Sequence, residues 1–312
     1  MQDKIERYFI WIILLFVSVA LLFPTLFIGF KGLIPIGLGV IMFGIGMNTP
    51  AASFKDVLVK PRDIIGLIIF RFMMMPFWAL AIAYGLNLTQ AETIGLLVLG
   101  AAPGGVAANV MAYLSKSNVA LTVLLTFGST LLSPIITPAL IYWLLHKSVT
   151  IHFWSMVMHI GSIILLPILG GFIFSSIKVM IIEKIKSILP TFSIFMVAMI
   201  IASLFALNQQ MILTFPGAVI AAVLALNLLG YFTGYSISYV MKQDSKSTLA
   251  AIFDYGMFDA IVAMVICTTF FSKEAAIPAV LISIIQNLTA PFIVRYQKKR
   301  LGFQIAIAKE DV

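Results

Sequence analysis

The stretch Gly100-Ala-Ala-Pro-Gly-Gly-Val-Ala-Ala-Asn109 interrupts a long apolar run, and a second interruption, Asp254-Tyr-Gly-Met-Phe-Asp259, lies in the other half of the chain. In the first, Pro103-Gly104-Gly105 removes a backbone N–H and lowers helix stability, so we predict two half-helices. We expect a similar split around Gly256. Backbone can leave the helical conformation within a membrane only where it lines a cavity or is buried in protein. The two interruptions therefore predict a site inside a membrane-spanning fold.

The composition supports a membrane protein. Of the 312 residues, 62% are apolar and 10% are charged, whereas soluble domains are about 45–50% apolar and about 25% charged. A soluble chain of this length cannot bury such a surplus. The single cysteine, Cys267, excludes an intramolecular disulfide framework and a thiolate metal cluster. The composition thus argues against soluble enzymes, nucleic-acid-binding proteins, disordered chains and disulfide scaffolds.

The apolar runs are numerous and long. A helix that crosses the hydrocarbon core needs about 20 apolar residues. Runs of this kind occupy residues 9–29, 33–50, 64–84, 92–115, 118–145, 151–177, 188–207, 213–241, 247–271 and 275–296. The first run is too long for a signal peptide and is expected to stay in the mature protein. We therefore predict an all-α polytopic membrane protein with ten transmembrane helices, which forms a single integral unit over residues 1–312.

The basic residues predict the orientation of the chain. With both chain ends in the cytoplasm, sixteen of the 20 Lys and Arg residues fall on the cytoplasmic side and three on the outer side, while Arg71 lies in the membrane. This bias agrees with the positive-inside rule. The net charge of +8 then reflects topology and attraction to anionic membrane lipid, and not a nucleic-acid partner. We expect a multi-pass protein of the cell membrane with cytoplasmic N- and C-termini.

The ten segments divide into five and five. Because five is odd, the second group enters the membrane from the opposite side, as an inverted repeat requires. The two repeats are predicted at about 8–145 and 151–297. The interruptions then fall in segments four and nine, which correspond to each other. Corresponding interruptions of this kind point to the binding site of a transporter.

Three charged residues, Arg71, Asp254 and Asp259, lie inside the apolar runs. Each costs about 2.5–3.5 kcal/mol on insertion scales, so we do not expect them to face lipid. Because arginine keeps its proton in proteins, Arg71 is predicted to pair with Asp254, with Asp259 or with both. The alternatives are that Arg71 extends to the cytoplasmic interface and that the carboxylates make only structural hydrogen bonds.

Uncharged polar residues accompany these charges. Four hydroxyl residues are spaced to share one helix face: Thr122, Thr126, Ser129 and Ser133. With Asn109 they offer oxygen ligands that suit a hard cation, whereas helix packing by small polar residues is the favoured reading for the stripe as a whole. Gln286 and Asn287 form a further polar pair, which either lines a substrate cavity or packs between helices.

The first interruption, continued through Asn118-Val-Ala-Leu-Thr122 and followed by Ser133-Pro-Ile-Ile-Thr-Pro138, resembles the bile acid:sodium symporter family. The resemblance covers nearly the whole chain. It implies a panel domain, about 8–58 and 151–208, and a core domain, about 62–145 and 213–297, in which the broken segments four and nine cross. It also implies sodium-coupled import of organic anions, among them bile acids and smaller carboxylates.

The resemblance assigns this chain a partly kept first sodium site. The family's asparagine falls on Asn109, its two hydroxyls fall on Thr122 and Thr126, and its central glutamate falls on Asp254. Its serine falls on Ala108, which has no side-chain ligand.

The family's second sodium site is altered in this chain. Its two glutamines fall on Arg71 and Phe258, and its asparagine falls on Asp259. A guanidinium there supplies positive charge without an ion. We therefore expect a secondary active transporter of small organic anions, coupled by alternating access to one sodium ion or proton and needing no other cofactor. The expected substrate cavity has these residues on its wall: Val106, Asp259, Gln286 and Asn287.

Other functions are compatible with these patterns. A carrier of the same fold could export or exchange organic anions or oxyanions, and a binding fold without transport could act as a sensor. An intramembrane aspartyl protease is poorly supported, because its two carboxylates must converge on one water and Asp254 and Asp259 share one broken segment. No enzyme activity is expected. Neither the substrate's identity nor the oligomeric state is predicted.

Overall fold

A computed structural model of the chain describes residues 15–48, 61–145, 152–177, 179–207 and 217–310, together with residues 12 and 209. Over these residues the chain is helical and has no strand. Five described helices are long and apolar enough to cross a membrane: Arg62–Gly85, Val119–Leu145, Phe153–Ser175, Gly217–Val240 and Glu274–Tyr296. The expected all-α membrane protein is thus confirmed at this level, and the count of ten spans stays a prediction.

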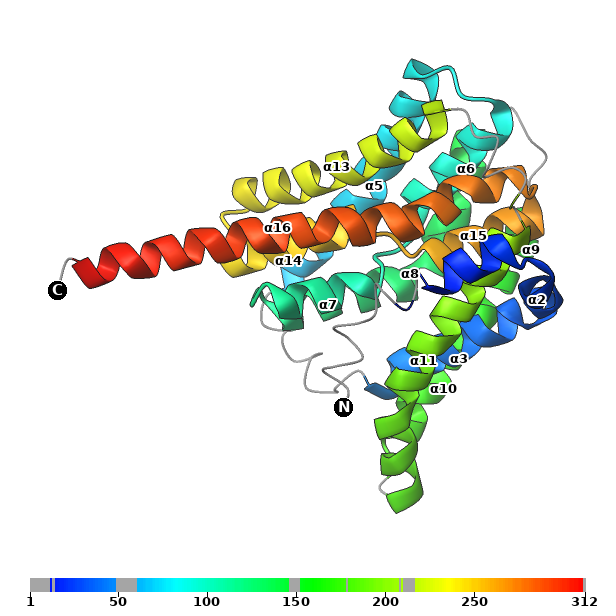
Figure 1. Cartoon of the computed structure of the whole chain (residues 1–312), viewed down its shortest axis with the longest axis horizontal. Coiled ribbons are helices and arrows are strands. Elements are labelled where there is room, and N and C mark those ends of the chain that lie inside the picture. Colours follow the sequence, from blue (N-terminus) through cyan, green and yellow to red (C-terminus); the bar gives the residue numbers. More distant parts are fainter. Residues whose placement is uncertain are drawn as a thin grey trace.

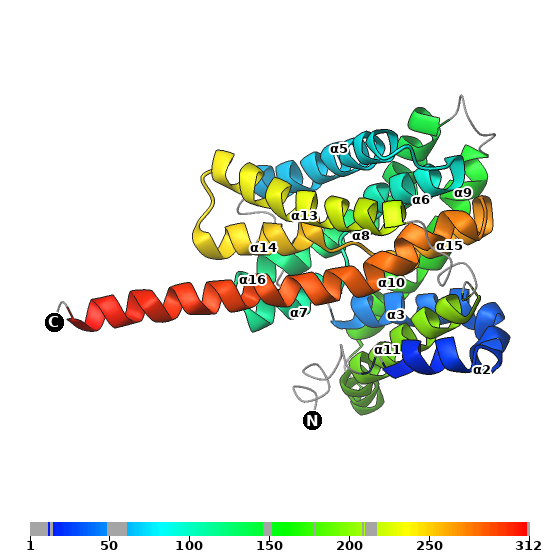
Figure 2. The same ribbon diagram turned by 45° about the horizontal axis from the view of Figure 1, so that its top comes forward.

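One group of helices contains the N-terminal part of the described chain (Figures 1 and 2). Its members are α2 (Thr25–Ile28), the 3-10 turn η1 (Gly29–Leu33), α3 (Ile34–Asn48), α10 (Leu166–Ser175) and α11 (Met180–Leu207). Helix α3 packs against α10 and α11. Helix α9 (Phe153–Ile160) and a π-helical turn, η2 (Gly161–Leu165), lead into α10.

A second, larger group surrounds the two interruptions. It contains α5 (Pro61–Gly85), α6 (Gln90–Ala101), α7 (Ala107–Leu114), α8 (Val119–Leu145), α13 (Gly217–Val240), α14 (Ser245–Gly256), α15 (Ala260–Phe270), the 3-10 turn η3 (Glu274–Ala276) and α16 (Ile277–Glu310). Helix α13 packs against α14 and α5. The end of α16 extends past the other helices toward the C-terminus (Figure 1).

The helices differ in extent from three of the predicted apolar runs. Residues 15–22 are helical but end before Pro24, so the first segment is not one continuous helix. Helix α11 begins at Met180 and includes Glu183, where we expected a break before residue 188. The apolar span Glu274–Tyr296 agrees with the predicted run at 275–296, and helix α16 itself continues to Glu310. Residues 49–58 and 213–216 of the predicted domains lie outside the described residues.

Two half-helices begin at side chains that cap them. The Thr89 hydroxyl accepts the Glu92 N–H (3.4 Å) while the Glu92 carboxylate accepts the Thr89 N–H (2.8 Å), a capping box that starts α6. The Asp244 carboxylate accepts the N–H groups of Lys246 (2.9 Å) and Ser247 (3.1 Å) at the start of α14. Both half-helices therefore run from a capped outer end to an inner end at an interruption.

The two interruptions lie against each other and form what we call the crossing, residues 102–106 and 257–259. The Gly105 N–H donates to the carbonyl of Met257 (2.8 Å), and the Asp259 N–H donates to the carbonyl of Pro103 (3.0 Å). Gly104 and Phe258 form an isolated antiparallel bridge. The crossing is therefore a short piece of β-type pairing between four half-helices.

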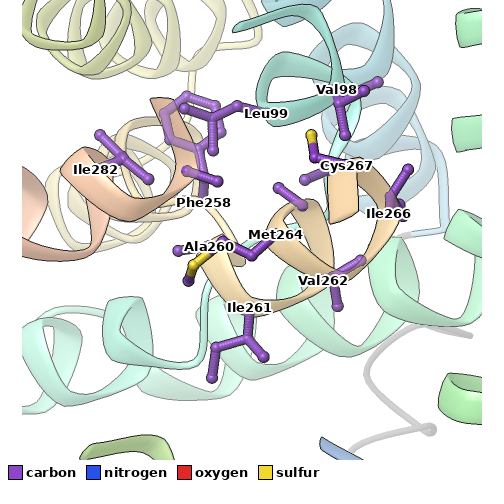
Figure 3. Packing of buried hydrophobic residues seen from close by; sticks show 14 of the residues in the cluster. Val98, Leu99, Phe258, Ala260, Ile261, Val262, Met264, Ile266, Cys267 and Ile282 are labelled. Atoms are coloured by element: carbon purple, nitrogen blue, oxygen red, sulfur yellow. The ribbon is translucent and has the colours of Figure 1, made fainter. Parts of the chain in front are cut away.

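Apolar packing fixes the position of α15 beside the crossing. Figure 3 shows the side chains of α15 together with Val98 and Leu99 of α6 and Ile282 of α16, all of which are buried in one cluster. Cys267 is in this cluster and is completely buried. Close packing of this kind holds the start of α15 in place, since a densely packed interior resists displacement.

Candidate functional site

Arg71 lies at the crossing and is fully buried, with 0% of the residue exposed. Its Nη1 donates to the carbonyls of Asp254 (3.0 Å) and Tyr255 (3.3 Å), and its Nη2 donates to the carbonyl of Ala102 (3.2 Å). These carbonyls belong to the C-terminal ends of α14 and α6, where a helix carries partial negative charge. The guanidinium is therefore held by the open inner ends of both half-helices.

Asp254 is the charge partner of Arg71. The Arg71 Nε lies 4.0 Å from the Asp254 Oδ2, and both side chains are buried. The guanidinium carbon lies 5.2 Å from the centroid of the Phe258 ring, within the range of a cation–π contact. The sequence left open whether Arg71 pairs with Asp254, with Asp259 or with both, and in the structure it pairs with Asp254. The Arg71 side chain does not extend to the protein surface, since it is fully buried.

Two further oxygen-bearing side chains, those of Thr126 and Asn109, lie on the other side of Asp254. The Thr126 hydroxyl lies 3.4 Å from the Asp254 Oδ1 and 3.4 Å from the Asn109 Oδ1. The other carboxylate oxygen, Asp254 Oδ2, faces the Arg71 Nε and is buried without a hydrogen-bond partner. Carboxylate, amide and hydroxyl oxygens together suit a hard cation. Among the described residues, no cluster of three or more His, Cys, Asp or Glu side chains offers a site for a metal of another kind.

Thr122 and Ala108 complete the positions expected for the first sodium site. Both are buried. The Thr122 hydroxyl donates to the carbonyl of Asn118 on its own helix (3.1 Å) and is not hydrogen-bonded to Asp254. The structure therefore brings Asn109, Thr126 and Asp254 together, while Thr122 lies one turn away along α8.

Polar side chains satisfy the backbone that the interruptions leave open. The Gln286 amide accepts the Phe258 N–H (2.9 Å) and donates to the Phe258 carbonyl (3.2 Å), so it pairs with that residue as a neighbouring strand would. Three further hydrogen bonds satisfy the interruptions. The Gly104 N–H donates to the Ser129 hydroxyl, the Asn227 amide donates to the Gly256 carbonyl, and the Thr137 hydroxyl donates to the Ala101 carbonyl. Buried backbone polar groups need such partners.

Two glycines allow the close approach of the chains at the crossing. A Cβ on Gly104 would collide with the Asp254 Oδ1, and a Cβ on Gly105 would lie 2.5 Å from the Phe258 carbonyl oxygen. Both positions therefore need glycine for reasons of space, in agreement with the Pro103-Gly104-Gly105 motif from which the interruption was predicted.

A cavity of about 340 Å³ lies beside the crossing. Helices α3 and α11 form one wall, and α7, α8, α15 and α16 form the other. The four residues expected at a substrate cavity all lie on it: Val106, Asp259, Gln286 and Asn287. Asn109 and Thr126 also face it, which places the oxygen cluster at its edge. This volume is within the usual range for small-molecule pockets, about 300–1,000 Å³.

Sequence reasoning missed the polar residues on the opposite wall of the cavity. Asn48 at the end of α3 and Ser193 on α11 line it. The Ser193 hydroxyl is buried without a hydrogen-bond partner. Only the polarity of Asn48 and Ser193 within apolar runs could have singled them out, since no motif surrounds either residue.

Comparisons with known proteins agree with one another. The sequence model of the Sodium Bile acid symporter family matches residues 35–215. A Bacillus subtilis (strain 168) protein named "Uncharacterized sodium-dependent transporter YocS" is 31% identical over 306 residues, which is 98% of this chain and 95% of that protein. "Probable sodium/metabolite cotransporter BASS1, chloroplastic" of Arabidopsis thaliana is 26% identical over 254 residues, and the match covers 81% of this chain and 63% of that protein.

Proposed function

This chain belongs to the sodium bile acid symporter family, and on that premise we propose that it is a sodium-coupled secondary transporter of a small organic solute that carries a carboxylate. The names of its relatives, a sodium-dependent transporter and a sodium/metabolite cotransporter, support the sodium coupling. A function in transport across the cell membrane also fits the five long apolar helices.

The position of Arg71 is the observation that carries the proposed stoichiometry. A guanidinium keeps its proton and is covalently part of the chain, so it is a permanent cation at the carbonyl ends of α6 and α14. With Asp254 and Asp259, the buried charge is −1 before a ligand binds. One sodium ion per cycle neutralises that charge. Its proposed ligands are the side chains of Asn109, Thr126 and Asp254. Thr122, one turn away on the same helix as Thr126, is proposed as a fourth ligand.

We propose that alternating access arises from a movement of the two groups of helices relative to each other. The panel domain, about 8–58 and 151–208, contains α3 and α11, and the core domain, about 62–145 and 213–297, contains the crossing. The cavity between α3, α11 and the crossing supports a movement of one domain against the other, because such a movement would open the cavity to each side of the membrane in turn. The inverted repeats at about 8–145 and 151–297 fit the same mechanism.

Uptake into proteoliposomes tests the proposal, with a panel of labelled carboxylates and either a sodium or a proton gradient. The wild type should need sodium with a Hill coefficient of about 1, since that coefficient cannot exceed the number of coupled sites. Arg71→Gln frees three carbonyl oxygens and should raise the Hill coefficient toward about 2. Arg62→Gln, on the exposed end of the same helix, is the matched control.

Two results would contradict the proposal. Uptake driven by a proton gradient in the complete absence of sodium would exclude sodium coupling. An Arg71→Gln variant that transports with unchanged sodium dependence would exclude the role of Arg71 as a substitute cation.

A further inference from the structure

The cavity beside the crossing carries an acidic side chain without a basic one. Among the described residues that line it, Asp259 is the only charged residue, and it is 7% exposed. Its Oδ1 accepts the N–H of Val262 (3.1 Å) at the start of α15. Arg71 is not on the cavity wall and is bound to Asp254 and to three carbonyls. The carboxylate also accepts a backbone hydrogen bond from Ile261, and it supplies the negative charge on the wall of the cavity.

A second acceptor faces the same space. Asn287 is 5% exposed and lines the cavity, and its Oδ1 is buried without a hydrogen-bond partner. Its amide nitrogen already donates to the carbonyl of Ser283 (2.8 Å), which fixes the amide with its oxygen unpaired. A buried acceptor without a partner costs folding free energy, so we expect this oxygen to bind a ligand that donates hydrogen bonds. A primary ammonium group donates three and carries the charge opposite to Asp259.

The wall of the cavity also holds a place for a carboxylate. Helix α7 begins at Ala107, and its N-cap residue, Val106, makes no side-chain cap. Both residues line the cavity. The N–H groups of Ala108 and Asn109 already donate to the carbonyls of Gly105 (2.9 Å) and Val106 (3.0 Å). This end of α7 therefore offers a carboxylate the Ala107 N–H and the partial positive charge of the helix dipole. The cavity is thus lined both by the N-terminus of α7 and by the acceptor oxygens of Asp259 and Asn287, groups of opposite sign.

Charge balance separates the possible solutes. Arg71, Asp254, Asp259 and one sodium ion sum to zero. A simple monocarboxylate would bring the sum to −1 beside the buried Arg71, Asp254 and Asp259, and an uncompensated charge is unfavourable at low dielectric. A solute that carries a carboxylate and an ammonium group keeps the sum at zero.

We propose that the cavity binds a zwitterionic solute with one carboxylate and one primary ammonium group, of the amino acid type. The ammonium group lies against Asp259 and the Asn287 oxygen, and the carboxylate lies at the N-terminus of α7. This inference rests on the proposed function, whose broader class of carboxylate-bearing solutes it narrows.

Matched pairs of probes that differ only in the amino group test this inference: 4-aminobutyrate with butyrate, β-alanine with propionate, and leucine with 4-methylpentanoate. Binding is measured by thermal stabilisation of the purified protein in detergent with sodium present, and by competition for uptake into proteoliposomes. In the wild type, at least one amino member should bind more tightly than its deaminated partner by about tenfold or more, the size expected for a desolvated charge pair.

Asp259→Asn removes the charge and keeps the helix cap, because asparagine caps as well as aspartate. It should abolish the preference for the amino member. Asp259→Ser, which also caps the helix, should abolish the preference as well. It controls for any hydrogen bond that the asparagine amide of Asp259→Asn makes with the solute. Asp63→Asn removes a carboxylate that is not on the cavity wall and that accepts the Gln243 amide, so it should leave the preference unchanged.

The outcomes separate this inference from the proposed function. No accumulation of any probe under a sodium gradient counts against the proposed function, and the binding measurement then decides the inference alone. Tighter binding of an amino member supports it. Equal or tighter binding of every deaminated partner, no binding of any amino member, or a preference that survives both Asp259 variants would overturn it.

Discussion

At the scale of single residues, Arg71 joins three segments of the chain through their backbone. It reaches the carbonyls of Ala102, Asp254 and Tyr255 and lies 4.0 Å from the Asp254 carboxylate. Removal of one partner from a buried ion pair costs about 3–5 kcal/mol, because the other charge stays buried and unpaired. Arg71 is therefore both part of the proposed ion chemistry and a structural tie between α5, α6 and α14.

Gly104 gives a prediction at the same scale. In Gly104→Ala the new Cβ would collide with the Asp254 Oδ1, so the carboxylate that the Thr126 hydroxyl contacts must move. We expect a loss of stability of about 1–3 kcal/mol, as for other overpacked sites, and a weaker stabilisation by sodium. Thermal unfolding in detergent over a sodium titration measures both effects.

Gly85→Ala is the control for this prediction. A Cβ at Gly85, near the end of α5, meets nothing within 4 Å, so the same chemical change should be tolerated there. A Gly104→Ala protein with the sodium response and unfolding temperature of the wild type would show that the close approach of Gly104 to Asp254 is needed neither for stability nor for sodium binding.

At the scale of elements, the outer ends of the half-helices depend on their caps. Asp244 accepts two N–H groups at the start of α14, and hydrogen bonds from the Ser247 hydroxyl and backbone lower the pKa of its carboxyl. Its folded pKa therefore lies below the unfolded value of about 3.9. The stabilisation is present above that value and is lost as the pH falls through the folded pKa.

Asp244→Ala should thus destabilise the protein by about 1 kcal/mol at neutral pH, the usual size of a lost cap. It should also remove part of the acid sensitivity, while Asp244→Asn should retain the cap and lose only the pH dependence. Unfolding temperatures between about pH 3 and pH 7, on either side of the aspartate pKa, distinguish the three proteins. An Ala variant as stable as the wild type at pH 7 would contradict this role.

Both interruptions were predictable from the sequence, and several helix ends were not. Proline and adjacent glycines weaken a helix wherever they stand, so the break after Ala101 could be located from Pro103 alone. Hydropathy marks the part of a helix that suits lipid. It says little about where a helix ends in water, and for this reason α11 starts at Met180 and α16 continues to Glu310, beyond the predicted limits.

The candidate site was predictable to the extent that its residues are unusual for a membrane. Arg71, Asp254 and Asp259 stood out because charges within apolar runs are rare. The pairing of Gln286 with the backbone of Phe258 depends on how α16 packs against the crossing. Such long-range contacts leave no periodic signal in the sequence.

At the scale of the whole molecule, the cavity lies where two groups of helices meet, and the native cysteine offers a way to follow it. Val106 on the cavity wall is 39% exposed, whereas Cys267 is 0% exposed. Val106→Cys should react with a membrane-impermeant thiol reagent, and sodium together with a bound solute should slow the reaction. The wild-type protein, with only its buried Cys267, should stay unlabelled and is the control.

Labelling of Val106→Cys in oriented vesicles, followed by mass, measures this accessibility from each side of the membrane. Reaction at a rate indifferent to sodium and solute would argue against a cavity that closes during transport. Modification of folded wild-type protein would contradict the burial of Cys267.

The hydrogen bonds of the crossing have a consequence for the membrane as an electrical barrier. A helix that opens in the middle of a bilayer usually draws in water to solvate its backbone, and water offers a route for stray ions. Here the Gln286 amide, the Ser129 hydroxyl and the Arg71 guanidinium take the place of that water at the exposed N–H and carbonyl groups. These backbone groups therefore need no water to satisfy them, so the interruption does not itself require an aqueous path for ions through the bilayer.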